Sequence, residues 1–103
     1  MTARERLSDR RGCESFGFRC GGMNYVASIA RFADGRLAEI FISTHKIGSD
    51  ADAAAKDSAV VASIALQFGV PVETIRRALL RDTRRIASSP LGVALDLIAD
   101  HAS

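Results

Sequence analysis

An Asp-Gly pair between two apolar segments constrains the fold of this chain more than any other feature. Asp34 and Gly35 separate residues 25–32 from residues 36–43, and both flanking segments are rich in aliphatic and aromatic side chains. An Asp-Gly pair supplies the positive φ angles that a two-residue type I′ hairpin turn requires. The sequence therefore predicts an antiparallel β-hairpin with Asp34 and Gly35 as its loop.

The register of this hairpin places apolar side chains on both of its faces. Phe32 should face Leu37, Ile29 should face Ile40, and Ala27 should face Ile42. One face then carries Ala27, Ile29, Ile40 and Ile42, and the other carries Val26, Phe32, Leu37 and Phe41, interrupted by Ser28 and Glu39. Because an antiparallel sheet in a small domain usually leaves one face in water, the second apolar face predicts a partner or a dimer.

A further strand is expected before the hairpin. Residues 14–20 alternate loosely, with Phe16 and Phe18 on one side, and Gly21-Gly22 indicates a turn. The sequence thus predicts a sheet of three antiparallel strands.

Helices are expected in the second half of the chain. Residues 51–68 predict an amphipathic helix that ends at Gly69, with Val61, Ile64, Ala65 and Phe68 as its apolar face. Pro71 opens a second helix with an apolar stripe of Val72, Ile75 and Leu79, and Ser89-Pro90 caps a third with a stripe of Leu91, Ala94, Leu95 and Ile98. Strands followed by helices predict an α+β domain, in which a three-stranded antiparallel sheet is followed by two or three packed helices.

The chain length of 103 residues corresponds to one domain. Residues 1–12 are polar and rich in arginine, so we expect a poorly ordered tail there and a single domain over residues 13–103. The sequence lacks the run of about 18 apolar residues that a membrane span needs, and its amino terminus has no apolar signal core. These features predict a cytoplasmic protein that does not contact a membrane.

The titratable side chains predict neither a catalytic set nor a metal site. The chain has two cysteines and two histidines, which are Cys13, Cys20, His45 and His101. Zinc sites show closely paired ligands, and that spacing is absent here. A cysteine nucleophile activated by His45 would need a spacing motif that the sequence lacks. We therefore expect two reduced structural thiols.

Two segments are candidate anion-binding sites. Lys46 and Ser49 precede the long helix, whose free N–H groups attract anions, but two aspartates in its first turn oppose this. On the second helix, Arg77, Arg81, Arg84 and Arg85 are expected on one face. Arginine suits bidentate phosphate contacts, so we favour Arg77, Arg81 and Arg84 over Lys46 as contacts to a nucleotide or nucleic acid. A merely solvated helix face is the alternative, and the net charge of +2 drives nucleic-acid binding only weakly.

Four short segments carry a resemblance to a known family. They are residues 39–42 (EIFI), 46–50 (KIGSD), 65–75 (ALQFGVPVETI) and 87–91 (ASSPL). The chain resembles the TSCPD domain over residues 24–99. That domain is named for a Thr-Ser-Cys-Pro-Asp signature and occurs at the C-terminal end of adenosylcobalamin-dependent ribonucleotide reductases and as stand-alone proteins. At the signature, Ser88 and Pro90 match, whereas Ala87, Ser89 and Leu91 stand where the family has Thr, Cys and Asp.

The resemblance implies a stand-alone accessory or regulatory domain in deoxynucleotide synthesis that binds a nucleotide or a large reductase chain. It implies adenosylcobalamin for the reductase and no cofactor for this chain, because radical reduction needs a large barrel that about 100 residues cannot form. Two alternatives remain, which are a small nucleic-acid-binding module and a structural homodimer module. We also expect a homo-oligomer formed through the sheet.

Overall fold

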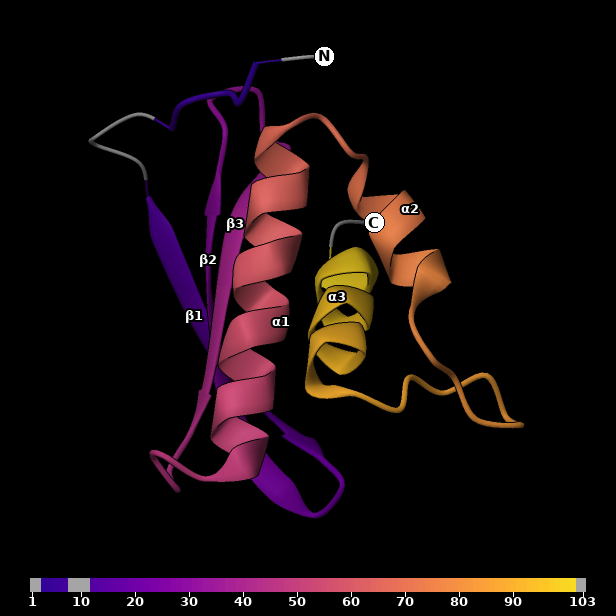
Figure 1. The fold of residues 1–103 in the computed structure, drawn as a ribbon. Helices are drawn as coiled ribbons and strands as arrows, with labels where there is room; N and C mark the ends of the chain where they lie inside the picture. The colour runs from indigo at the N-terminus through magenta and orange to yellow at the C-terminus, as the bar shows by residue number, and fades with distance from the viewer. Residues whose placement is uncertain (1–2, 8–11, 102–103) are drawn as a thin grey trace.

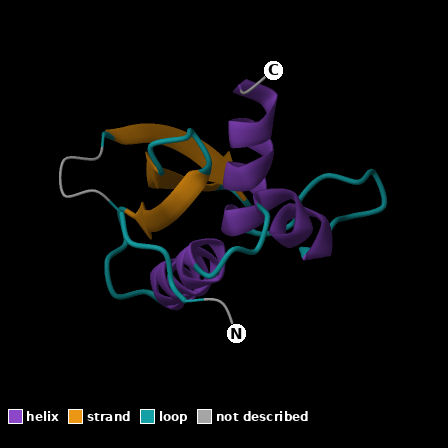
Figure 2. Ribbon diagram, turned by 90° about the horizontal axis from the view of Figure 1, so that it is seen from above, coloured by secondary structure: helices purple, strands orange, loops and turns teal. Residues whose placement is uncertain are grey.

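Three antiparallel strands followed by three helices make up residues 3–7 and 12–101, the part of the chain that the computed structural model describes (Figures 1 and 2). The strands are β1 (Cys13–Cys20), β2 (Met23–Arg31) and β3 (Leu37–Thr44), and they lie in the order β1-β2-β3. The helices are α1 (Asp50–Gln67), α2 (Val72–Ala78) and α3 (Pro90–His101). The α+β fold class is confirmed. No helix in the described ranges is both long enough and apolar enough to cross a bilayer.

The two hairpin turns differ from the sequence-based expectation. Gly21 and Gly22 both have positive φ, at 58° and 78°, so the two-residue turn of type I′ geometry joins β1 to β2. In the second hairpin only Gly35 has positive φ, at 94°, and its N–H donates to the Phe32 carbonyl at 2.9 Å. The predicted two-residue loop at Asp34 and Gly35 is therefore wrong. Asp34 instead uses its carboxylate to accept from the Arg36 N–H at 3.0 Å, which stabilises a longer loop.

The register of β2 and β3 is partly as predicted. Ile29 pairs with Ile40, and Ala27 pairs with Ile42. A shift between Ala30 and Arg31 then makes Leu37 the partner of Arg31 and not of Phe32, which corrects the predicted pairing. One extra residue on β3 turns Leu37 into the core, where it is 5% exposed. The open face of the sheet therefore keeps only two large exposed apolar side chains, Val26 and Phe41.

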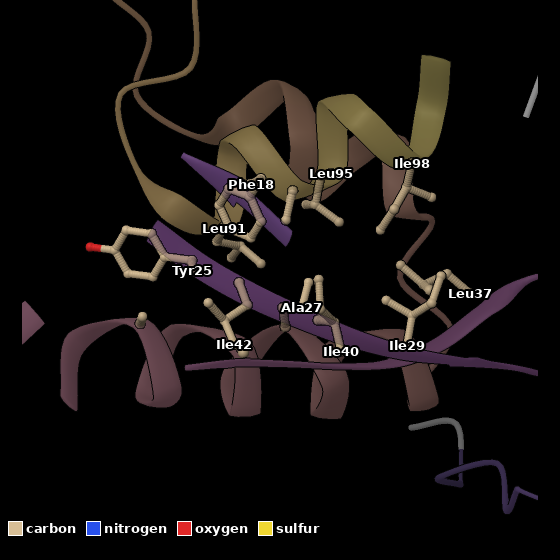
Figure 3. Close-up of a cluster of buried hydrophobic side chains, with 14 of the residues drawn as sticks. Phe18, Tyr25, Ala27, Ile29, Leu37, Ile40, Ile42, Leu91, Leu95 and Ile98 are labelled. Atoms are coloured by element: carbon tan, nitrogen blue, oxygen red, sulfur yellow. The ribbon is translucent and has the colours of Figure 1, made fainter. Parts of the chain in front are cut away.

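The core lies between the sheet, α1 and α3. Figure 3 shows the α3 side chains Leu91, Leu95 and Ile98 pointing toward those of β2 and β3, so the stripe predicted for α3 is confirmed. The stripe predicted for α1 is wrong, because Val61, Ile64 and Phe68 are exposed. The buried side of α1 instead carries the small residues Ala55, Ala59 and Ala62 together with Leu66.

Small residues face inward on α1 because the helix lies against the outer edge of β3 (Figure 1). Ser63 Oγ accepts from the Ile40 N–H at 2.9 Å and donates to the Ile40 carbonyl at 3.0 Å. Gln67 Nε2 donates to the Ala38 carbonyl at 3.1 Å. A strand edge left open exposes unpaired backbone groups. Polar side chains of α1 pair this edge, and only a helix with a narrow alanine face approaches closely enough to do so.

Part of the expected tail over residues 1–12 contacts the domain. The Glu5 N–H donates to the Gln67 carbonyl, and the Glu5 carboxylate accepts from the Arg36 guanidinium at 3.0 Å. Arg4 Nε donates to Gln67 Oε1 at 2.6 Å. Residues 3–7 thus run past the C-terminal end of α1. Residues 1–2 and 8–11 of the expected tail lie outside the described residues.

Candidate functional site

The loop before α1 contains Lys46 and Ser49, two of the residues expected to bind an anion. The Asp52 carboxylate occupies the donors of this loop, because it accepts from the N–H groups of Thr44 at 3.1 Å and Gly48 at 3.2 Å. Ser49 Oγ accepts from the Asp52 N–H at 3.2 Å and donates to the Lys46 carbonyl at 2.7 Å. Groups that would hold an external phosphate therefore already bind a carboxylate of the chain itself.

Asp52 is buried, with 2% of its surface exposed, and it is held in its ionised form. Lys56 Nζ lies 2.8 Å from Oδ2, one helical turn away. The hydrogen bond from Lys56, and after it those from Thr44 and Gly48, hold the pKa of Asp52 below its ordinary value of 3.8. The carboxylate thus joins the end of β3 to the start of α1 and acts as an internal anion.

The predicted arginine face does not form. α2 ends at Ala78, and the chain then folds back as a small hairpin in which Arg81 pairs with Ala87. Arg77 is the only one of the three favoured arginines on the helix, where its side chain is 81% exposed. Arg84 lies in the hairpin turn, and its N–H donates to Asp82 at 2.8 Å. Arg77, Arg81 and Arg84 therefore do not share a helix face, although their predicted role in binding stays a prediction.

Asp96 on α3 binds two of the arginines in this region. Arg81 places two nitrogens 2.8 and 2.7 Å from the Asp96 carboxylate, and Arg76 Nη1 lies 3.0 Å from it. Arg76 also donates to Glu73 at 2.9 Å. The hydrogen bonds from Arg81 lower the pKa of Asp96 most, partial burial opposes them by raising it, and the bond from Arg76 lowers it further. The net result is a pKa below the ordinary range of a carboxyl group. The cluster joins α2 and the following hairpin to α3. Because the guanidinium groups of Arg76 and Arg81 already pair with carboxylates, they are poorly placed to bind an external anion.

Sequence reasoning missed Asp96 because no spacing rule connects it to its arginines. It follows Arg81 by 15 residues and Arg76 by 20 residues. The contact exists only because the hairpin after α2 reverses the chain over α3. The one available signal was an acidic residue in the middle of the apolar part of α3, which carries no other charge before Asp100.

Ser88, Ser89 and Pro90, the positions of the family signature, form the start of α3. Ser89 Oγ accepts from the Gly92 N–H at 3.2 Å, which confirms its predicted capping role. A Cβ on Gly92 would lie 2.9 Å from the Ala87 Cβ, so glycine permits this close turn. Cys20 Sγ lies 4.0 Å from the Ser88 carbonyl. The segment packs against the end of β1 and begins a helix.

The two cysteines lie at opposite ends of β1. Seven residue steps of about 3.3 Å place Cys13 and Cys20 on the order of 23 Å apart, which excludes a disulfide between them. Cys13 is exposed, and burial raises the pKa of the Cys20 thiol. Among residues 3–7 and 12–101, no three His, Cys, Asp or Glu side chains group as metal ligands would.

Comparison with known proteins places this arrangement in a family. The sequence model of the TSCPD domain matches residues 3–99. The chain is 39% identical over 70 residues to a vitamin B12-dependent ribonucleotide reductase of Agrobacterium fabrum, and 36% identical over 73 residues to one of Bradyrhizobium diazoefficiens. A third such reductase, of Rhodopirellula baltica, is 36% identical over 72 residues. No solved structure matches the chain significantly.

The similarity covers most of this chain and little of the relatives. The three alignments span 68%, 71% and 70% of the chain, but only 6–7% of each reductase. The chain is therefore similar to one small segment of those enzymes. The family match begins at residue 3 and so includes the segment that contacts the end of α1.

Proposed function

Because this chain belongs to the TSCPD domain family, we propose that it is an accessory domain of ribonucleotide reduction that works by binding the large reductase chain. One observation carries the proposal, namely the 39% identity with a segment that forms 6% of a vitamin B12-dependent ribonucleotide reductase. A segment present within a reductase has a surface suited to the rest of that enzyme. A separate chain with the same segment can use that surface in trans.

The described side chains favour binding over catalysis. The polar groups of the two candidate sites are engaged with one another, as Asp52 is with Lys56 and Asp96 is with Arg81. The signature segment begins a helix, and Ser89 stands where the family has the signature cysteine. We therefore assign nucleotide reduction to the large chain and a regulatory or positioning role to this domain.

The residues of this chain do not fit adenosylcobalamin. Its two imidazoles, His45 and His101, are both exposed. The groove beside β3 encloses about 300 Å³ and no imidazole lines it. The hollow that His101 does line, between β1 and α3, encloses about 380 Å³. Both volumes lie near the lower limit for small-ligand sites. We place the cofactor with the large chain and derive no step through it here.

The experiment that tests the proposal is a direct binding measurement. The domain is titrated into the vitamin B12-dependent ribonucleotide reductase of the same source, with binding followed by calorimetry and ribonucleoside-diphosphate reduction assayed in parallel. We expect a saturable complex and a changed reduction rate. Absence of a complex at high-micromolar concentration, together with an unchanged rate, would contradict the proposal. Bovine serum albumin at the same concentration controls for crowding.

The alternative function, binding of a nucleotide or nucleic acid, has weaker support. It relies on exposed cations such as Arg77 and Lys46, whereas Arg76 and Arg81 are paired with the carboxylates of Glu73 and Asp96. The same titration repeated with nucleoside diphosphates and single-stranded DNA separates the two functions. A binding constant that falls steeply with salt would favour the nucleic-acid function.

A further inference from the structure

α1 and its C-cap residue carry three large apolar side chains on the side that faces away from the core. Val61 is 67% exposed, Ile64 is 40% exposed and Phe68 is 39% exposed. These residues follow Ala54 and Asp57 at alternating spacings of three and four residues, which places all five along one line of the helix. This is the spacing of a seam that packs against a second helix.

The apolar surface continues from α1 onto the open face of the sheet. Val60, which is 45% exposed, lines the groove of about 300 Å³ that also contains Val26 and Phe41. The apolar face of α1 and the sheet therefore form one surface, which we call the α1 surface: Val26, Phe41, Val60, Val61, Ile64 and Phe68. Contiguous apolar surfaces of this kind mark interaction sites on soluble domains.

Charge is distributed unequally along this surface. Asp50 and Asp57 are exposed on the N-terminal half of α1, on the same line as the apolar seam. Beyond the C-terminal end of the helix lie the exposed side chains of Arg4 and Arg6, and Arg4 is fixed there by its bond to Gln67. The carboxylate of Glu5, between these two arginines, pairs with Arg36 at 3.0 Å. One end of the seam is thus acidic, and two arginines stand at the other.

A second copy placed antiparallel satisfies both the apolar seam and the charges. With Ile64 opposite Ile64 of the second copy, Val61 faces the other Phe68, and Asp57 lies about 10 Å from the centre at 1.5 Å per residue. That position is just past the C-terminal end of the other α1, where Arg4 lies. A parallel copy would instead bring acid against acid.

We propose that the α1 surface is the interface of a two-fold symmetric homodimer, in which antiparallel α1 helices pack along Val61, Ile64 and Phe68 and Asp57 pairs with Arg4 of the second copy. Such an interface is isologous, so the two ends of one seam must be complementary to each other. None of the side chains of the α1 surface belongs to the core, so we expect the single chain to fold without the dimer. It is independent of binding to a reductase.

Sedimentation velocity of the full chain tests the apolar part of the interface. The parent protein should shift from 11.0 kDa toward twice that mass as its concentration rises into the high-micromolar range. Ile64→Glu should weaken dimerisation by about tenfold or more, because it buries an unpaired charge. Ile47→Glu is the matched control, because Ile47 is 83% exposed in the loop before α1 and lies outside the α1 surface. This variant should dimerise as the parent protein does. A parent protein that stays monomeric overturns the proposal.

A charge exchange tests the orientation. Asp57→Lys alone and Arg4→Glu alone should each weaken the dimer, and the two together should restore it. Failure of the double variant to recover affinity would overturn the antiparallel arrangement. Thermal melting followed by circular dichroism, at a low concentration where the parent is monomeric, should give the parent midpoint for Ile64→Glu and Asp57→Lys, which excludes unfolding as the cause. Arg4→Glu should melt slightly lower, because it loses the bond to Gln67. If the parent protein stays monomeric and Ile64→Glu abolishes its binding to a reductase chain, the α1 surface belongs to that partner and the homodimer is overturned.

Discussion

Asp52 is the residue on which the start of α1 depends. Its carboxylate accepts from two backbone N–H groups and faces Lys56, so Asp52→Asn should remove the ion pair and lower the melting temperature by several degrees. The folded-state pKa lies below 3.8, so the stabilisation is complete above that pH and is lost as the pH falls through the lowered value. Melting curves of parent and variant between neutral pH and pH 2 should therefore converge in acid. Curves that stay equally far apart at every pH would contradict this account.

Gly92 is the second residue with a sharp expectation. Gly92→Ala gains helix propensity of about 1 kcal/mol, but the new methyl group would lie 2.9 Å from the Ala87 Cβ. Overpacking costs about 1–3 kcal/mol, so we expect a net loss of stability in urea unfolding. Gly17→Ala is the control, because its Cβ would be 3.8 Å from the nearest atom, and it should be neutral or slightly stabilising. A stabilising Gly92→Ala would show that the signature turn is free to move.

At this scale the sequence predicts roles that depend on near neighbours. The Ser89 cap follows from the Ser-Pro pair, and the opposition of Asp52 to an external anion follows from its place in the first turn of α1. The bonds of Asp96 to Arg76 and Arg81 join residues far apart in the chain, so they could be seen only in the structure.

At the scale of elements, α1 had two competing faces, and periodicity selected the wrong one. Val61, Ile64 and Phe68 are larger than Ala55, Ala59 and Ala62, so they dominate any hydrophobic pattern. The distance between α1 and β3 decides which face of α1 is buried, because α1 must come close enough for Ser63 and Gln67 to hydrogen-bond to the edge of β3. The hairpin turns show a similar limit, since Gly-Gly and Asp-Gly both permit type I′ geometry and only packing of the strands selects between them.

Removal of one edge-pairing side chain measures this contact. Ser63→Ala leaves the N–H and carbonyl of Ile40 without their side-chain partner in a buried site, which should cost about 1–3 kcal/mol in chemical unfolding. Ser58→Ala is the matched control on the same helix, because Ser58 Oγ bonds only to the Ala55 carbonyl of its own helix, and it should change stability little. Equal effects of the two substitutions would show that the β3 edge gains nothing from α1.

At the scale of the whole molecule, the order of strands and helices was enough to predict the fold class. The position of the arginines was not, because α2 is one short helix and the hairpin after it turns Arg81 toward α3. The sequence predicts which segments fold, and long-range packing decides which of their faces remain in solvent.

The anion-binding expectation belongs to the whole molecule, because it compares two distant surfaces. Arg77→Glu combined with Arg81→Glu is compared with Lys46→Glu in titrations with nucleoside diphosphates and single-stranded DNA at low and moderate salt. If the domain binds an anion, the arginine pair should reduce affinity by about tenfold, roughly one contact of 1.4 kcal/mol, and Lys46→Glu by less. Thermal melting must accompany the titration, since Arg81→Glu also breaks the bond to Asp96. Loss of binding only in Lys46→Glu would identify the loop as the site.

The two thiols lie at the two ends of β1, so labels attached to them report the distance between the ends of that strand. Cys13 is exposed and Cys20 is half-buried with a raised pKa, so a thiol-reactive spin label should attach to Cys13 first. Exhaustive labelling would then mark both ends of one strand, and dipolar spectroscopy would report its length without any substitution. Singly labelled chains would report only the separation between two copies, so the native cysteines alone distinguish a distance within one chain from a distance across a dimer.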